Sequence, residues 1–90
     1  MSTTTKVRAP SPSELAALRS AQAWFDAHIG RCPRSCEWKY GARAGVWKAH
    51  GLAPMPSPWP SGSAADDARN AGFQYGYEQA RHSLAAGVQA

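Results

Sequence analysis

Large apolar side chains are scarce in this sequence. Hydrophobic residues make up 43% of the 90 residues, but alanine supplies much of that fraction. The large aromatic side chains are only four tryptophans, three tyrosines and two phenylalanines. This composition excludes a large core, because a chain of this length forms one small domain of marginal stability. It favours an all-α domain that packs closely around small residues.

Long apolar segments are also missing. No run approaches the roughly 20 residues that a membrane-spanning helix needs. The polar N-terminal segment "MSTTTKVRAPSPS" lacks the apolar region of a secretory signal. We therefore expect a cytoplasmic protein that does not bind a membrane.

The sequence has no recognisable catalytic signature. It contains neither a phosphate-binding G-x-x-x-x-G-K-[ST] loop nor a G-x-G-x-x-G turn. Asp66 and Asp67 are interpreted as charges that favour a helix N-terminus, and His82 as a charge near a helix C-terminus. The sequence thus argues against an enzyme, without excluding one, and predicts no cofactor.

Cysteine is rare, and the C-x-x-C pair of strong zinc sites is absent. Four residues have side chains of the kinds that bind zinc, namely His28, Cys32, Cys36 and His50. However, Gly30 and Pro33 interrupt any helix through the first three. We expect no metal, with a zinc site at these four residues as the less favoured alternative. A disulfide is not expected in a reducing cytoplasm.

Capping signals divide the chain into three predicted helices within one domain, residues 11–87. Ser11, Pro12 and Glu14 form a capping box with proline at the first helical position. The helices are expected over residues 12–29, 36–50 and 64–86, after a disordered tail at 1–10. Leucines, Phe25 and Ile29 give the first helix an amphipathic face.

Glycines recur at helical spacing in the second and third helices. "WKYGARAG" and "FQYGYEQA" share an aromatic residue, a tyrosine and a glycine in the same order. Glycine in a helix costs about 1 kcal/mol relative to alanine, so these residues need a reason. We predict that the two helices form a hairpin that packs through Gly41, Gly45, Gly72 and Gly76. A frayed helix is the alternative.

A proline-rich strap, "PMPSPWP" at residues 54–60, separates these two helices. Alternating prolines stiffen an extended chain and remove N–H donors. A flexible linker would more typically use glycine and serine. The strap is therefore interpreted as a brace, and Trp59 is predicted to pack on the helices.

Positive charge is concentrated in one part of the chain, whose net charge is +4. Only Glu37 opposes the basic residues there, which are Arg31, Arg34, Lys39, Arg43 and Lys48. Tyr40 and Trp47 are nearby candidates for stacking on bases, or for the core. From charge alone, RNA, an acidic protein and no partner remain open, as does the oligomeric state.

The glycine helices and the strap together resemble the ribosome modulation factor family over residues 41–81. That family pairs a G-x-x-A-G helix with a Cys-Pro-aromatic linker and an aromatic-x-x-G-aromatic-x-x-A helix. The matching residues here are Gly41, Ala44, Gly45, Pro58, Trp59, Phe73, Gly76, Tyr77 and Ala80, with Ser57 in place of the cysteine.

This resemblance implies a small basic regulator that binds ribosomal RNA or the ribosome. A sister branch of the family is linked to fluoroquinolone resistance through a proposed ATP-dependent modification of the drug. Relatives carried by phages and mobile elements suggest an alternative, a module that binds and inhibits a host protein. RNA is thus the leading expectation, an acidic host protein the second, and drug phosphorylation the third.

Overall fold

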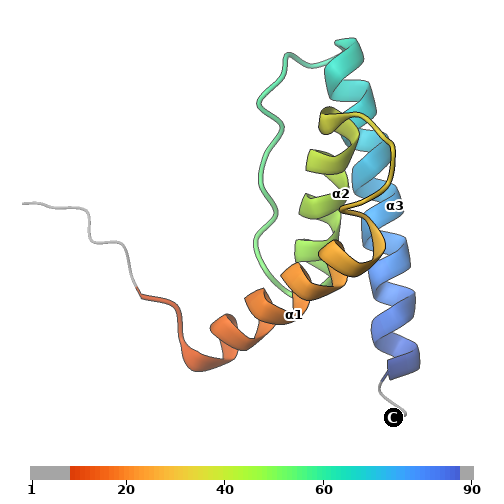
Figure 1. Cartoon of the computed structure of the whole chain (residues 1–90). Helices are drawn as coiled ribbons and strands as arrows, with labels where there is room; N and C mark the ends of the chain where they lie inside the picture. Colours follow the sequence, from red (N-terminus) through yellow and green to blue (C-terminus); the bar gives the residue numbers. More distant parts are fainter. Residues whose placement is uncertain (1–8, 88–90) are drawn as a thin grey trace, which may run out of the picture.

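The computed structural model describes residues 9–87, which form a small all-α domain of three helices (Figure 1). These are α1 (Pro12–His28), α2 (Cys36–Ala49) and α3 (Ala64–Gly87). Their bounds agree with the expected ranges to within one residue at each end. The predicted disordered tail, apart from residues 9 and 10, lies outside the described residues.

A serine precedes each helix, and its hydroxyl accepts from one N–H group of the first turn. At α1, the Ser11 hydroxyl accepts from the Glu14 N–H and the Glu14 carboxylate accepts from the Ser11 N–H, at 3.2 and 2.8 Å. The Ser35 hydroxyl caps α2 at 3.2 Å, and the Ser63 hydroxyl accepts from the Asp66 N–H at 3.1 Å. These caps explain why the helix starts could be predicted.

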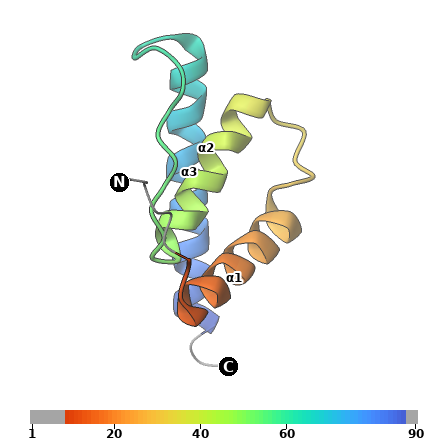
Figure 2. The same ribbon diagram turned by 90° about the vertical axis from the view of Figure 1, so that its left-hand side faces the viewer.

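Helices α2 and α3 lie side by side (Figures 1 and 2). Their backbones are in direct contact at the glycine positions. All four glycines of the predicted contact are buried. A Cβ atom on Gly41 would overlap the Arg69 carbonyl group, and one on Gly76 would overlap the Ala42 carbonyl group. Close backbone approach, rather than fraying, therefore accounts for these glycines.

The two helices run in the same direction, so the predicted hairpin is corrected to a parallel pair that packs through the same four glycines. Gly41 faces Arg69 while Gly45 faces Phe73, so both numbers rise together along the contact. The intervening chain must therefore return along the length of α2. The 14 residues of α2 span about 21 Å, whereas residues 51–63 reach about 40 Å when extended.

The strap makes this return, with its prolines on the outside. Met55, Ser57 and Trp59 are half-buried, whereas the four alternating prolines are exposed. Trp59 packs edge-on against Tyr40 of α2, with ring centroids 5.3 Å apart. This alternation is expected for an extended segment that presents every second side chain to the helices.

Side chains from both helices tie the strap down. The Tyr40 hydroxyl donates to the Pro56 carbonyl at 3.0 Å, and the Arg69 guanidinium donates to the Met55 carbonyl at 2.6 Å. A proline-rich segment offers carbonyl acceptors but few N–H donors. The helices supply those donors, and the strap is thereby a fixed part of the fold.

Helix α1 crosses the α2–α3 pair and is held mainly through its C-terminal half. Ala21 and Ile29 are fully buried in a core that includes Val46 of α2 and Ala80 of α3. Leu15, which belongs to the predicted apolar face, is instead 38% exposed. The reason is visible in Figure 1, where α1 begins well to one side of the pair.

Asp66 joins the strap to the start of α3, and its environment makes stability depend on pH. Hydrogen bonds from the Ser57 hydroxyl and the Gly62 N–H, with the nearby Arg69 charge, lower the pKa of Asp66 below its usual 3.8, although burial opposes them. A carboxylate whose pKa is lower in the folded state stabilises the fold above the unfolded pKa. This contribution is lost as the pH falls below 3.8 through the lowered value.

We therefore expect Asp66→Asn to flatten the acid-induced loss of stability. Urea unfolding of the variant and the wild type at neutral and acidic pH measures this difference. Asp67→Asn is the matched control, because Asp67 is the exposed neighbour in the same turn. The interpretation is wrong if both variants keep the wild-type pH dependence.

Candidate functional site

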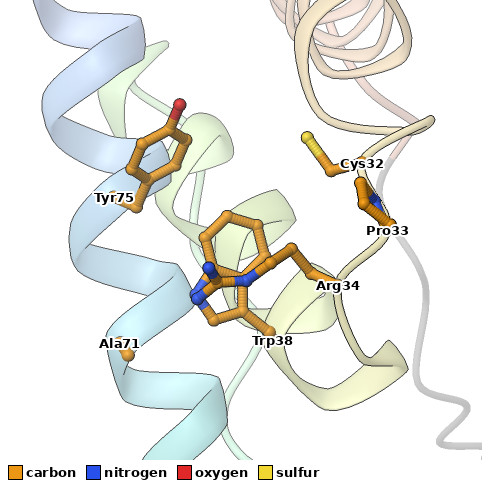
Figure 3. Close-up of a pocket in the computed structure, with 6 residues that line it drawn as sticks. All are labelled: Cys32, Pro33, Arg34, Trp38, Ala71 and Tyr75. Atoms are coloured by element: carbon orange, nitrogen blue, oxygen red, sulfur yellow. The ribbon is translucent and has the colours of Figure 1, made fainter.

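An open pocket of about 400 Å³ lies between α3, the start of α2 and the connector that joins α1 to α2 (Figure 3). Trp38 comes from α2, and Ala71 and Tyr75 come from successive turns of α3. The connector supplies Cys32, Pro33 and Arg34. The pocket thus joins residues far apart in the sequence.

Two aromatic rings and one cation dominate this pocket. The rings of Trp38 and Tyr75 lie with centroids 5.2 Å apart and planes tilted by 45°. Trp38 is 7% exposed, whereas Tyr75 is 45% exposed. The Arg34 guanidinium lies over the Trp38 ring, 4.3 Å from its centroid. The result is an exposed Tyr75 ring beside a nearly buried tryptophan ring that carries a positive charge over its face.

The helix contact places these groups together. A Cβ atom on Gly72 would overlap the Trp38 carbonyl group, so this part of α3 lies directly against the first turns of α2. Tyr75, three residues after Gly72, is thereby brought beside the Trp38 ring. Arg34 stands just before the Ser35 cap, which fixes where the connector ends and α2 begins.

The predicted basic residues differ in their exposure and in their contacts. Arg31 and Arg34 are exposed on the connector. Lys39 is half-buried and donates to the Gly30 carbonyl at 3.0 Å, so it fixes the end of α1. The Lys48 ammonium lies 5.6 Å from the Tyr77 ring centroid, on the side of α2 that faces α3.

Arg43 also contacts α1. Its guanidinium donates to the Gln22 side chain at 3.0 Å and lies 4.8 Å from the centroid of the Trp47 ring. Arg43 is nevertheless exposed, and Trp47 is half-buried against the core. Of the two stacking candidates in α2, Tyr40 thus holds the strap and Trp47 supports the core.

Tyr75 is a site residue that the sequence reasoning missed. Its ring is the most exposed of the large apolar side chains in the described part of the chain. One signal was available, because Tyr75 lies between Gly72 and Gly76 and therefore beside the helix contact. Its exposure depends on where the connector runs, which the helical pattern does not specify.

A second hollow of about 290 Å³ lies between α1 and α2. It is lined by Phe25, Cys36, Lys39, Tyr40 and Arg43. The three polar side chains of α2 in this hollow are already hydrogen-bonded to α1, the connector or the strap. We therefore interpret this hollow as part of the contact between the two helices rather than as a ligand site.

Two of the four possible zinc ligands, His28 and His50, contact other groups of the fold. His28 stacks on Trp24 with centroids 4.4 Å apart, and His50 Nδ1 lies 2.9 Å from the Val46 carbonyl oxygen. Both Cys32 and Cys36 are free thiols. Within residues 9–87, no three histidine, cysteine or acidic side chains gather as metal ligands.

In the same range, no helix is long and apolar enough to cross a bilayer.

Comparisons with protein-family models, with curated proteins and with solved structures find no match for this chain.

Proposed function

We propose that this protein is a non-enzymatic cytoplasmic regulator that binds RNA, with the ribosome as its target. The observation that carries the proposal is the exposed Arg34 guanidinium on the Trp38 ring, beside the exposed Tyr75 ring. Proteins that bind single-stranded nucleic acid combine basic side chains along the backbone with aromatic rings under the bases. The connector supplies the cation and α3 the exposed ring, and both groups line the same pocket.

Charge supports the same partner. Arg31 and Arg34 lie on the connector, and no acidic side chain lines the adjoining pocket. Arginine binds phosphate through several N–H donors and also stacks on flat rings. Lys39 and Arg43 hold α1 against α2, so we assign the RNA contact chiefly to the two connector arginines.

The resemblance to the ribosome modulation factor family supports the ribosome as the target. Its matching residues in this chain serve chiefly the helix contact, because Gly41, Gly45, Gly76 and Ala80 are all buried. At the position of the family cysteine, the Ser57 hydroxyl hydrogen-bonds to Asp66. The resemblance thus concerns the residues that pack the two helices together. The proposed RNA contact lies beside those residues.

Capture of the tagged protein from a bacterial lysate, with and without ribonuclease, tests this proposal. We expect ribosomal RNA to co-purify, and the association to disappear with ribonuclease or high salt, because phosphate contacts depend on salt. If neither treatment changes what co-purifies, RNA is not the partner.

A host-protein inhibitor is the second candidate, and exposed leucines favour it. Leu15 of α1 and Leu84 of α3 are 38% and 39% exposed. Apolar contacts are strengthened rather than screened by many salts. A stoichiometric protein complex that survives both ribonuclease and high salt would therefore replace the RNA proposal with this one.

A further inference from the structure

We infer that the pocket of Trp38, Tyr75 and Arg34 is a binding site for one unpaired nucleobase, with the adjoining phosphate on the connector arginines. This inference rests on the proposed RNA binding and adds a specific site to it. The alternative within that proposal is a surface that contacts phosphates alone and leaves the pocket empty.

The size and walls of the pocket fit a planar ligand. Its volume of about 400 Å³ falls within the range of small-molecule sites, which begins near ~300 Å³. The walls of the pocket are mostly apolar and are formed by Trp38, Tyr75, Ala71 and Pro33. Arg34 is the one charged residue that lines it. Ala71 has a small side chain, so one side of the pocket stays open below the Tyr75 ring (Figure 3).

Tyr75 supplies the stacking surface. The ring is 45% exposed, although one side of it contacts Trp38. Figure 3 shows the Tyr75 ring standing at the pocket with its hydroxyl directed away from Ala71. A base stacked on an aromatic side chain raises affinity by about 5- to 150-fold. A base can reach this ring only when it is outside a duplex, as in RNA loops and ends.

Arg34 connects the base site with the RNA backbone. Its guanidinium lies over the Trp38 ring, 4.3 Å from the ring centroid, and this contact favours that position before any ligand binds. The N–H groups at the edge of a stacked guanidinium remain able to donate to a phosphate. Arg31, three residues earlier on the same connector, is exposed and extends this positive surface. The base would thus stack on Tyr75, while the phosphate would bind the connector arginines.

Fluorescence anisotropy with two labelled probes tests the inference. One probe is a single-stranded RNA pool of random sequence, and the other is an abasic ribose-phosphate oligomer of the same length. We expect wild type to bind the RNA about 5- to 150-fold more tightly than the abasic oligomer. Tyr75→Leu should lose this preference while its weak abasic binding stays unchanged. Tyr75→Phe, which keeps the ring, should retain the preference.

A second variant keeps the test independent of Tyr75. Ala71→Leu fills the pocket with an uncharged side chain at an exposed position of α3, and thermal unfolding checks that each variant is folded. We expect it to lose the preference for bases as Tyr75→Leu does.

The outcomes separate this inference from the proposed function. Salt-dependent binding that is equal for both probes, or a preference that survives both Tyr75→Leu and Ala71→Leu, overturns the nucleobase site and leaves RNA binding intact. If wild type binds neither probe, both the site and the proposed function are wrong.

Discussion

Leucine in place of Gly41 or Gly76 is expected to unfold the domain or to lower its melting temperature by more than any surface change. Leucine is the better helix former, by nearly 1 kcal/mol at a helix interior. Any loss of stability must therefore come from contacts between helices. At both positions even a Cβ atom would overlap the backbone of the opposite helix.

The opposing atoms cannot move aside as a flexible side chain can. A Cβ atom on Gly41 would lie only 2.6 Å from the Arg69 carbonyl carbon, and one on Gly76 only 2.9 Å from the Ala42 carbonyl carbon. The helices would have to separate along the contact that carries most of the packing. Overpacking a core typically costs about 1–3 kcal/mol, which is a large part of the stability of so small a domain.

Gly87→Leu is the matched control, because a Cβ atom on Gly87 at the end of α3 would meet no atom of another helix or of the strap within 4 Å. Thermal unfolding followed by circular dichroism compares the three variants. We expect Gly87→Leu to melt near the wild-type temperature and the other two far below it. Wild-type melting of Gly41→Leu or Gly76→Leu would show that the helices are not in backbone contact.

The second large effect is expected from reversing the charge of the two connector arginines, Arg31→Glu with Arg34→Glu. A hydrogen bond to a charged group contributes about 1.5–3 kcal/mol. Loss of two phosphate contacts should therefore weaken RNA binding by about 100-fold or more. Both residues are exposed, so the domain should remain folded.

Arg19→Glu with Arg81→Glu is the matched control for net charge. These two arginines are also exposed, and Arg81 also lies over an aromatic ring, that of Tyr77. Both double variants change the net charge equally, so long-range attraction falls similarly in each. We expect the control to bind RNA much more tightly than the connector variant in a titration at fixed salt. Equal losses would show that total charge, rather than the connector, binds the RNA.

The sequence predicted the helices well because their determinants are local. Ser11, Ser35 and Ser63 each precede a helix and cap it as their positions suggest. The four helical glycines also indicated the contact correctly, since only close approach makes glycine favourable there. Capping and helix periodicity involve residues a few positions apart, and a single sequence contains that information.

The direction of α3 could not be predicted in the same way. Both an antiparallel and a parallel pair would bury the same four glycines. The choice depends on whether the strap turns sharply or runs back along α2. Donors from Tyr40 and Arg69 hold the carbonyl groups of the strap along this path, and they are distant from the strap in sequence.

The arrangement of the candidate site also depends on contacts between residues that are far apart in the sequence. The sequence singled out the basic stretch, but it did not show which of its side chains contact other parts of the fold. In the structure Lys39 donates to Gly30 and Arg43 to Gln22, because α1 folds back onto α2. Tyr75 becomes a pocket residue only through the crossing at Gly72, which joins α3 to the start of α2.

Binding of the wild-type protein to single-stranded RNA at increasing salt concentration tests the proposed function most directly. Each phosphate contact lowers the slope of log affinity against log salt by about 0.7 for a single strand. The two connector arginines therefore predict a slope of about −1.4 or steeper for the wild type. The slope of the Arg31→Glu, Arg34→Glu variant should be shallower than the wild-type slope by about 1.4. A wild-type slope near zero, or no binding at low salt, would contradict RNA binding by this surface.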